Sequence, residues 1–185
     1  MLEVEVKASL KGVSVLRLRA AVESAWGPCR KALRETDVYF NGGGRDFRKS
    51  DEALRLRSCA DAVTGQPIET VLTYKGPKQD AVSSTRTEYE TSVGSGETAG
   101  KLLAALGYRE AFTVDKLRRE YALDGVTLCL DTVAGLGEFL ELELLAPDES
   151  RREPAVERLL RLLDQLGVPR ENLTRKSYLE LLAER

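Results

Sequence analysis

The sequence predicts an α+β domain in which eight antiparallel strands form a barrel or closed sheet, with helices packed outside it. Three observations support this fold. Eight short segments alternate apolar and polar residues, turn-forming residues separate most of these segments, and four other segments carry apolar residues at helical spacing. The chain has 185 residues, enough for one domain with a real core, so we expect a single domain over residues 1–185.

The predicted strands share a period of two, which places successive side chains on opposite faces of a sheet. Glycine-rich or aspartate-glycine turns separate several of them, for example 41–44 and 124–125, and longer turn-like stretches span 61–67 and 76–83. The predicted strands are 2–8, 31–40, 53–59, 68–75, 85–93, 110–123, 127–133 and 138–145.

The predicted helices have apolar residues on one face, as Val15, Leu18 and Val22 show in the first of them. Three of the four end at a glycine, which is a common helix stop. Amphipathic helices could cover the apolar exterior of a barrel whose interior is charged. The predicted helices are 9–26, 96–106, 154–166 and 177–184.

Composition excludes several kinds of site. The chain has no histidine, which removes Ser-His-Asp and Cys-His triads and every histidine-ligated metal site. Its three cysteines are widely spaced and form no CxxC motif, so we expect free thiols in a reducing compartment. The start of the chain lacks the basic and apolar regions of a signal peptide, and no stretch approaches the ~18 apolar residues of a membrane helix. We therefore expect a cytoplasmic protein.

The phase of the charged residues is the most informative feature. Like charges recur two residues apart, roughly 6.5–7 Å along a strand, and such pairs repel unless counterions lie between them. A one-sided sheet with a solvated charged face is one interpretation. An ionic interior, where a divalent cation relieves the acidic pairs and a polyanion relieves the basic pairs, is the other. The charged faces carry Glu3, Glu5 and Lys7; Arg55 and Arg57; Lys75; Glu88 and Glu90; Lys116 and Arg118; and Glu141 and Glu143.

The motifs, read in order, cover nearly the whole chain. Residues 3–7 read Glu-Val-Glu-Val-Lys, an ExExK pattern. Later pieces are 37–40, 54–57, 72–77, 86–90, 116–118, 130–131, 139–143 and 176–178. This ordered set resembles the CYTH superfamily, the triphosphate tunnel enzymes. Within it, residues 45–47 and 51–55 resemble the class IV adenylyl cyclase branch.

The resemblance implies a closed tunnel of eight antiparallel strands that holds Mg²⁺ or Mn²⁺ and a triphosphate. The metal ligands it implies are Glu3, Glu5, Glu90, Asp131, Glu141 and Glu143. The triphosphate-binding residues are Lys7, Arg55, Arg57, Lys75, Lys116, Arg118 and Lys176. The candidate catalytic residues are Lys75, Tyr39 and Lys116, although Tyr39 is equally explained by packing.

The leading functional interpretation is a class IV adenylyl cyclase-like enzyme that converts ATP to cyclic AMP and pyrophosphate. The alternative is hydrolysis of tripolyphosphate or an organic triphosphate such as thiamine triphosphate, and a non-catalytic polyphosphate or nucleotide binding module is a third. Cyclase and triphosphatase need nearly the same tunnel residues, and the adenine pocket is not identified. The net charge of −2 gives no basic field, so neither nucleic acid nor a membrane is an expected partner, and a homodimer is left open.

Overall fold

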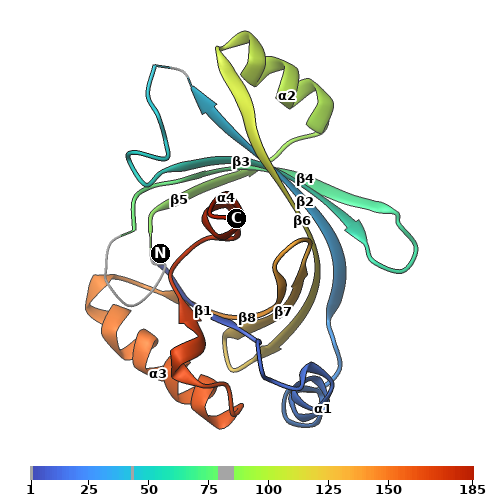
Figure 1. The fold of residues 1–185 in the computed structure, drawn as a ribbon, viewed down its shortest axis with the longest axis vertical. Helices are drawn as coiled ribbons and strands as arrows, with labels where there is room; N and C mark the ends of the chain where they lie inside the picture. Colours follow the sequence, from blue (N-terminus) through green and yellow to red (C-terminus); the bar gives the residue numbers. More distant parts are fainter. Residues whose placement is uncertain (1, 43, 79–85) are drawn as a thin grey trace.

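The computed structural model describes residues 2–42, 44–78 and 86–185. Its strands form one antiparallel sheet in the order β5-β4-β3-β2-β6-β7-β8-β1-β9. The sheet curls around an interior space (Figure 1). The strands are β1 (Leu2–Ser9), β2 (Lys31–Gly42), β3 (Ala53–Asp61), β4 (Pro67–Lys75), β5 (Glu88–Ser92), β6 (Tyr108–Leu123), β7 (Val126–Val133), β8 (Gly137–Ala146) and β9 (Leu173–Thr174). The helices are α1 (Val15–Trp26), α2 (Gly96–Ala105), α3 (Arg152–Gln165) and α4 (Tyr178–Ala183), with short 3₁₀ turns at Glu149–Arg151 and Arg170–Asn172.

The sheet differs from the expected eight-stranded closed barrel in strand count and in how its ends meet. The ninth strand, β9, pairs with β1 at Lys7 and Ala8, and its two residues are too short to show any alternation. A single bridge between Glu3 and Arg86 links β1 to the segment before β5. Within the described ranges, no continuous ladder joins β5 to β1. The antiparallel α+β architecture is confirmed, whereas a fully hydrogen-bonded barrel is not.

Most predicted elements are confirmed with shifted ends. The first helix starts at Val15, not at residue 9, because a turn closed by the Val13 amide and the Leu10 carbonyl comes first. Strand β2 continues through Gly42, two residues into the predicted loop 41–44, because it stays paired with β6. A Cβ at Gly42 would lie 2.8 Å from the carbonyl oxygen of Gly107, so only glycine fits this close pairing. Part of the predicted turn 76–83, and residue 85 of the predicted fifth strand, fall outside the described residues.

The outward faces of the strands are apolar and are covered by helices. Helices α1 and α3 pack on β1, β6, β7 and β8, and this core contains Val4, Leu128 and Leu142 from the sheet with Leu159 and Leu163 from α3. Helix α2 packs Leu103 on Phe40 and Leu56 in a second cluster. The alternation of each strand then turns its charged positions toward the interior.

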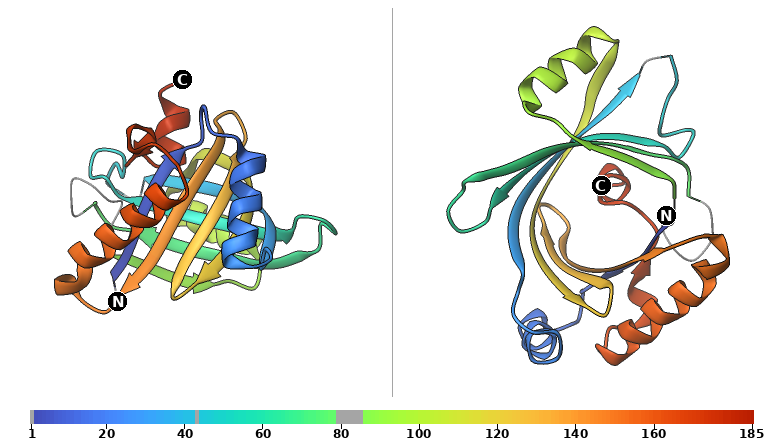
Figure 2. Two further views of the ribbon diagram at one scale, coloured as in Figure 1. Left: turned by 90° about the horizontal axis from the view of Figure 1, so that it is seen from below. Right: turned by 180° about the vertical axis from the view of Figure 1, so that it is seen from behind.

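The fourth helix was expected outside the barrel, but the structure places it elsewhere. Helix α4 lies inside the ring of strands, and a turned view shows it at one end of them (Figures 1 and 2). It packs Tyr178, Leu179 and Leu182 against a third apolar cluster that includes Val114 and Phe139. Helix α4 therefore covers a mouth of the interior space.

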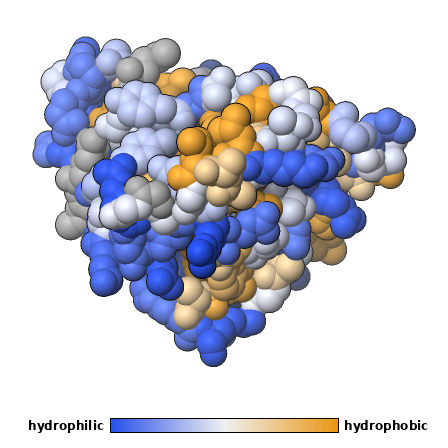
Figure 3. Space-filling view, turned by 90° about the horizontal axis from the view of Figure 1, so that it is seen from above, coloured by the Kyte–Doolittle hydropathy of each residue, from blue (hydrophilic) through white to orange (hydrophobic). Residues whose placement is uncertain are grey.

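The exterior combines charged and apolar side chains. Leu102 and Leu106, near the end of α2, are exposed. On the face shown in Figure 3, hydrophobic side chains form a patch bordered by hydrophilic ones. Among the helices described, none combines the length and the hydropathy that spanning a bilayer requires.

The contact between α3 and the sheet predicts a stability effect. Leu159→Ala should lower the free energy of unfolding by about 2–5 kcal/mol, because Leu159 is fully buried and truncation leaves a cavity. Leu145→Ala, at an exposed site on β8, is the matched control and should change it by less than about 0.5 kcal/mol. Urea denaturation measures both variants, and equal effects would contradict this description of the core.

Candidate functional site

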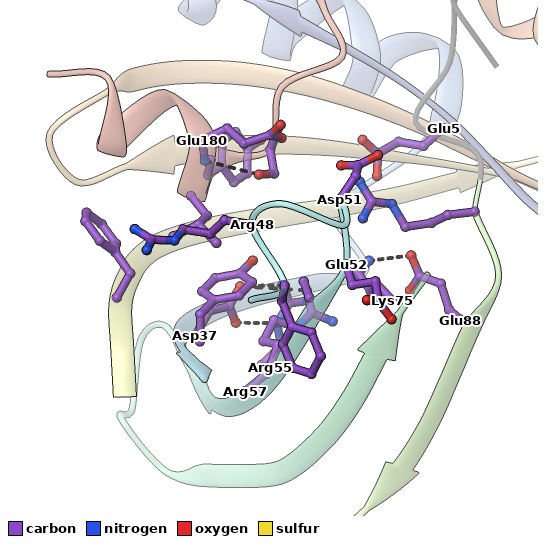
Figure 4. A pocket seen from close by; sticks show the side chains of 18 of the residues that line it. Glu5, Asp37, Arg48, Asp51, Glu52, Arg55, Arg57, Lys75, Glu88 and Glu180 are labelled. Atoms are coloured by element: carbon purple, nitrogen blue, oxygen red, sulfur yellow. Dashed lines mark hydrogen bonds and ion pairs between the residues drawn. The ribbon is translucent and has the colours of Figure 1, made fainter. Parts of the chain in front are cut away.

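The space inside the curled sheet is a cavity of about 520 Å³. Strands β1 to β6, strand β8 and helix α4 contribute to its walls, and Figure 4 shows charged side chains reaching into it from several of these strands. All the site residues predicted from sequence line it except Asp131 and Lys176. The predicted residues that line the cavity are Glu3, Glu5, Lys7, Tyr39, Arg55, Arg57, Lys75, Glu90, Lys116, Arg118, Glu141 and Glu143.

Two carboxylates of β2 neutralise part of the basic lining. Asp37 is 1% exposed, and its two oxygens accept hydrogen bonds from Arg57 Nε (2.6 Å) and Nη2 (2.8 Å). Glu35 lies 3.0 Å from Lys116 Nζ and 3.1 Å from Arg57 Nη1. Burial alone would raise the pKa of Asp37, but Arg55, Lys116 and Arg57 outweigh it and hold the pKa well below its usual range. Both acids therefore act as fixed counterions that orient the cations.

Sequence reasoning assigned no role to Glu35 or Asp37. The alternation of Glu35, Asp37 and Tyr39 along β2 was the available signal, since all three share the inward face. Their cationic partners come from β3 and β6, so the pairing depends on strand order.

A second group of ion pairs connects β6, β7 and β8. Arg118 donates to both oxygens of Asp131, at 2.8 and 2.6 Å, and also contacts Glu141. Lys7 Nζ lies 3.1 Å from Glu141 and 3.0 Å from Glu5. Glu141 is thus paired with two cations. Asp131 is fully buried behind Arg118 and is not part of the cavity wall.

An acidic corner, which we define as Glu3, Glu5 and Glu143, occupies one side of the cavity. Oxygen atoms of these three carboxylates lie within 4.8 Å of one another, and Glu5 is directly opposite Glu143 in the β1–β8 register. Burial, with smaller contributions from neighbouring acids, raises the pKa of Glu143 to about 8. Burial and Glu88 raise the pKa of Glu3 to about 7. Without a counterion, the fold therefore favours the protonated forms of Glu3 and Glu143. A hard divalent cation with oxygen ligands fits the corner, because its charge could replace those protons.

The other predicted metal ligands are placed differently. Glu90 is largely exposed at its side chain and accepts a hydrogen bond from Thr73 at 2.9 Å. Glu141 and Asp131 are held in the ion pairs with Arg118. Within the described part of the chain, the structure brings three of the six predicted acids together as a possible ligand set.

The remaining cations lie on the wall formed by β3 and β4. Arg55 donates to Thr73 at 3.2 Å, and Lys75 Nζ lies 2.5 Å from Glu88. Burial and the nearby Arg55 lower the pKa of Lys75 below its usual value, even though Glu88 acts in the opposite direction. Lys75 therefore gives up its proton more readily than an ordinary lysine does.

The structure places the predicted site residues Tyr39 and Lys176 differently with respect to the cavity. Tyr39 lines the cavity but also packs against Val114 and Phe139, so it has both the contacts expected of a core residue and access to the site. Lys176 is half exposed and does not line the cavity, although its partner Glu184, at 2.6 Å, does. Its neighbour Arg175 lines the cavity instead. Residues 175–177 precede α4 without regular structure, so no periodicity could predict which side chain points inward.

Comparison with known families matches residues 1–178 to the CYTH domain. The chain belongs to the CYTH family. The Methanocaldococcus jannaschii protein named "Putative adenylate cyclase MJ0240" is 36% identical over 183 residues, which is 98% of each protein. The structure of the PH1819 protein from Pyrococcus horikoshii matches with a TM-score of 0.89 and 38% identity over 98% of both chains. HpAC1 from Hippeastrum, described as having a dominant triphosphatase activity, shares the fold at a TM-score of 0.68 and 17% identity over 99% of this chain and 95% of its own.

The acidic corner of this CYTH protein predicts a pH dependence of stability. The pKa of Glu143 is about 8 in the fold and about 4.5 ordinarily, so the folded state holds its proton more tightly than the unfolded state. The resulting stability is fully present below about pH 4.5 and is lost as the pH rises through about 8. In the presence of chelator, the wild type should therefore lose stability relative to Glu143→Gln between pH 5 and 8, by at most about 1.4 kcal/mol per pH unit.

Calorimetric melting in EDTA across this pH range measures the difference. Glu138→Gln is the matched control, because Glu138 lies on the same strand outside the cavity, where it accepts a hydrogen bond from Thr132. The Tm of Glu138→Gln should change with pH in the same way as the Tm of the wild type. A parallel curve for Glu143→Gln as well would mean that Glu143 is not protonated in the fold.

Proposed function

We propose that this CYTH protein is a metal-dependent enzyme that acts on a triphosphate, with class IV adenylyl cyclase chemistry as the leading reaction. One observation carries the proposal: three carboxylates close enough to share a cation line the same cavity as a set of buried lysines and arginines. A triphosphate carries dense charge in a line, which such a row of donors matches. The name of the 36% identical Methanocaldococcus jannaschii protein supports the cyclase assignment.

The residues divide the work by charge. Glu3, Glu5 and Glu143 would hold Mg²⁺ or Mn²⁺, which when bound neutralises phosphate oxygens. Glu141 and Glu90 complete the acidic side of the cavity, and Asp131 supports it by holding Arg118. We assign the triphosphate to the basic wall, which consists of Lys7, Arg55, Arg57, Lys75, Lys116 and Arg118.

In the cyclase reaction, the ribose 3′-oxygen attacks the α-phosphorus as the bond from that phosphorus to the bridging oxygen breaks. Pyrophosphate leaves along the basic wall, where Arg55 and Arg118 stabilise its growing charge. Lys75, with its lowered pKa, is the candidate to accept the 3′-hydroxyl proton, and Lys116 and Tyr39 orient the chain of phosphates. In the alternative reaction, water attacks a phosphorus in the same cradle. The fold shared with HpAC1, a protein described with triphosphatase activity, is the observation that favours this second candidate.

Product identification separates these reactions. The purified chain is incubated with ATP and, separately, with tripolyphosphate, each with Mg²⁺ or Mn²⁺, and products are followed by phosphorus NMR. Cyclic AMP and pyrophosphate from ATP support the cyclase. Orthophosphate from either substrate supports the triphosphatase instead, and binding without turnover supports a binding module. Failure to bind either compound would overturn the triphosphate assignment.

The metal assignment predicts the behaviour of one carboxylate. Glu143→Gln should reduce turnover by at least roughly 10–100-fold, because even residues that only support a metal ligand have effects of this size. Glu138→Gln, outside the cavity on the same strand, should retain wild-type turnover. Initial rates at saturating metal measure both. Turnover that survives excess chelator would contradict metal dependence.

The basic wall predicts a ladder of ligand effects. Tripolyphosphate should raise the Tm more than pyrophosphate, and pyrophosphate more than phosphate, because each lost phosphate leaves cations without a partner. Arg55→Ala should weaken tripolyphosphate binding by roughly 1.5–3 kcal/mol, the range for a hydrogen bond to a charged group. Arg34→Ala, on the outward side of β2, is the control and should bind as the wild type does. Equal Tm shifts for all three anions would mean that binding in the cavity does not depend on the number of phosphate groups.

A further inference from the structure

Tyr178, the first residue of α4, places an aromatic ring close to two lysines of the basic wall. The ring is 5% exposed and lines the cavity. Lys7 Nζ lies 4.8 Å from the ring centroid and Lys116 Nζ lies 5.4 Å from it, so both ammonium groups are within cation–π range. The two lysines come from β1 and β6, so one side chain of α4 contacts cations from separate parts of the sheet.

The hydroxyl of Tyr178 reaches a third cation indirectly. It donates a hydrogen bond of 2.9 Å to Asp131 Oδ2, the same oxygen that accepts Arg118 Nη2 at 2.6 Å. Burial, together with Glu141 and Asp131, raises the pKa of Tyr178 well above its usual value, so the hydroxyl stays a donor. The ring and the hydroxyl together therefore contact the network of interactions that positions Lys7, Lys116 and Arg118.

The start of α4 fixes this ring in place. Ser177 and Glu180 form a capping box, so the backbone entering the helix is held on both sides of Tyr178. Lys78 Nζ lies 3.2 Å from Glu180 and 2.7 Å from Asp51. It therefore links the helix to the loop before β3. Phe139 packs its ring against Tyr178 at 5.1 Å between centroids. These contacts leave the ring little freedom to move.

An aromatic face has an advantage over an acid at this position. A carboxylate between Lys7 and Lys116 would hold them, but it would also repel an incoming polyanion. A ring attracts both ammonium groups through its quadrupole and adds no net negative charge. Lys7 and Lys116 already have carboxylate partners in Glu141 and Glu35, so the ring adds a contact that orders both lysines without adding further negative charge.

We propose that Tyr178 is a positioning residue for triphosphate binding, ordering Lys7 and Lys116 with its ring and Arg118, through Asp131, with its hydroxyl. The proposal rests on the triphosphate function proposed above. A positioning role differs from a packing role in a way that can be measured. If Tyr178 positions the lysines, loss of its ring should weaken triphosphate binding less when one of those lysines is already absent.

Titration calorimetry with tripolyphosphate and Mg²⁺ tests the role of the ring. Tyr178→Leu should weaken binding roughly 5- to 30-fold, the combined value of two partly desolvated cation–π contacts. Tyr178→Phe keeps the ring and should recover most of that loss. Tyr121→Phe is the control, because it removes a buried tyrosine hydroxyl that bonds to Glu23 outside the cavity. This variant should bind within about threefold of wild type.

Coupling to the lysine separates positioning from packing. In a Lys7→Met background, Tyr178→Leu should cost a smaller factor than in the wild type, because one of its partners is gone. The same factor in both backgrounds, or unchanged binding by folded Tyr178→Leu, would overturn the proposal. Wild-type protein that does not bind tripolyphosphate would overturn the proposed function instead.

If Tyr178→Leu does not fold, the wild type still provides a test. With carbon-13-labelled lysine, the ε-methylene signals of Lys7 and Lys116, assigned through Lys→Arg variants, should be shifted upfield by the ring current. They should stay shifted when tripolyphosphate is added, since a positioned cradle does not rearrange on binding. Ordinary shifts for both lysines, or shifts lost on binding, would overturn the proposal.

Discussion

Buried charge must be compensated, and this requirement organises the structure. The inward faces of the sheet carry lysines, arginines and carboxylates that are almost completely removed from water. Ion pairs in such a place seldom stabilise a fold more than apolar packing would, yet removing one partner leaves a costly unpaired charge. Six of these cations have acidic neighbours within 4 Å: Lys7, Arg55, Arg57, Lys75, Lys116 and Arg118. The apolar faces are then left on the outside, where α1, α2 and α3 must cover them.

The interior separates permanent partners from exchangeable ones. Asp37 and Asp131 each accept two hydrogen bonds from one guanidinium group, which fixes Arg57 and Arg118 in orientation as well as position. Glu3, Glu5 and Glu143 have no comparable set of cationic donors, and their mutual repulsion is relieved by protonation or by a cation. The fold thus fixes Arg57 and Arg118 with its own acids, whereas the acidic corner has no such paired guanidinium group.

The period-two alternation predicted the strands and the inward set well, because both depend on local spacing alone. Glu5 and Glu143 could be expected on inward faces, but their direct opposition required the register of β1 and β8. The counterion role of Asp37 was not predictable for the same reason, since its partners come from other strands. Helix α4 has the amphipathic pattern of an outer helix, and only tertiary packing places it in the mouth of the cavity. Lys176 and Arg175 lie in an irregular segment, where no period distinguishes inside from outside.

The register that turns every second side chain inward also limits how the gene can change length. A one-residue insertion within β1 would move Val4 and Val6 into the ionic interior and send Glu5 and Lys7 toward the core under α3. A substitution at one of these positions changes a single side chain. An inserted residue instead exchanges the inward and outward faces of the rest of the strand. Length variation among homologues should therefore be tolerated mainly in connections such as residues 62–66, the tip of the β3–β4 hairpin that projects away from the ring (Figure 1). Such tips are where evolution can add new segments without disturbing the charged interior.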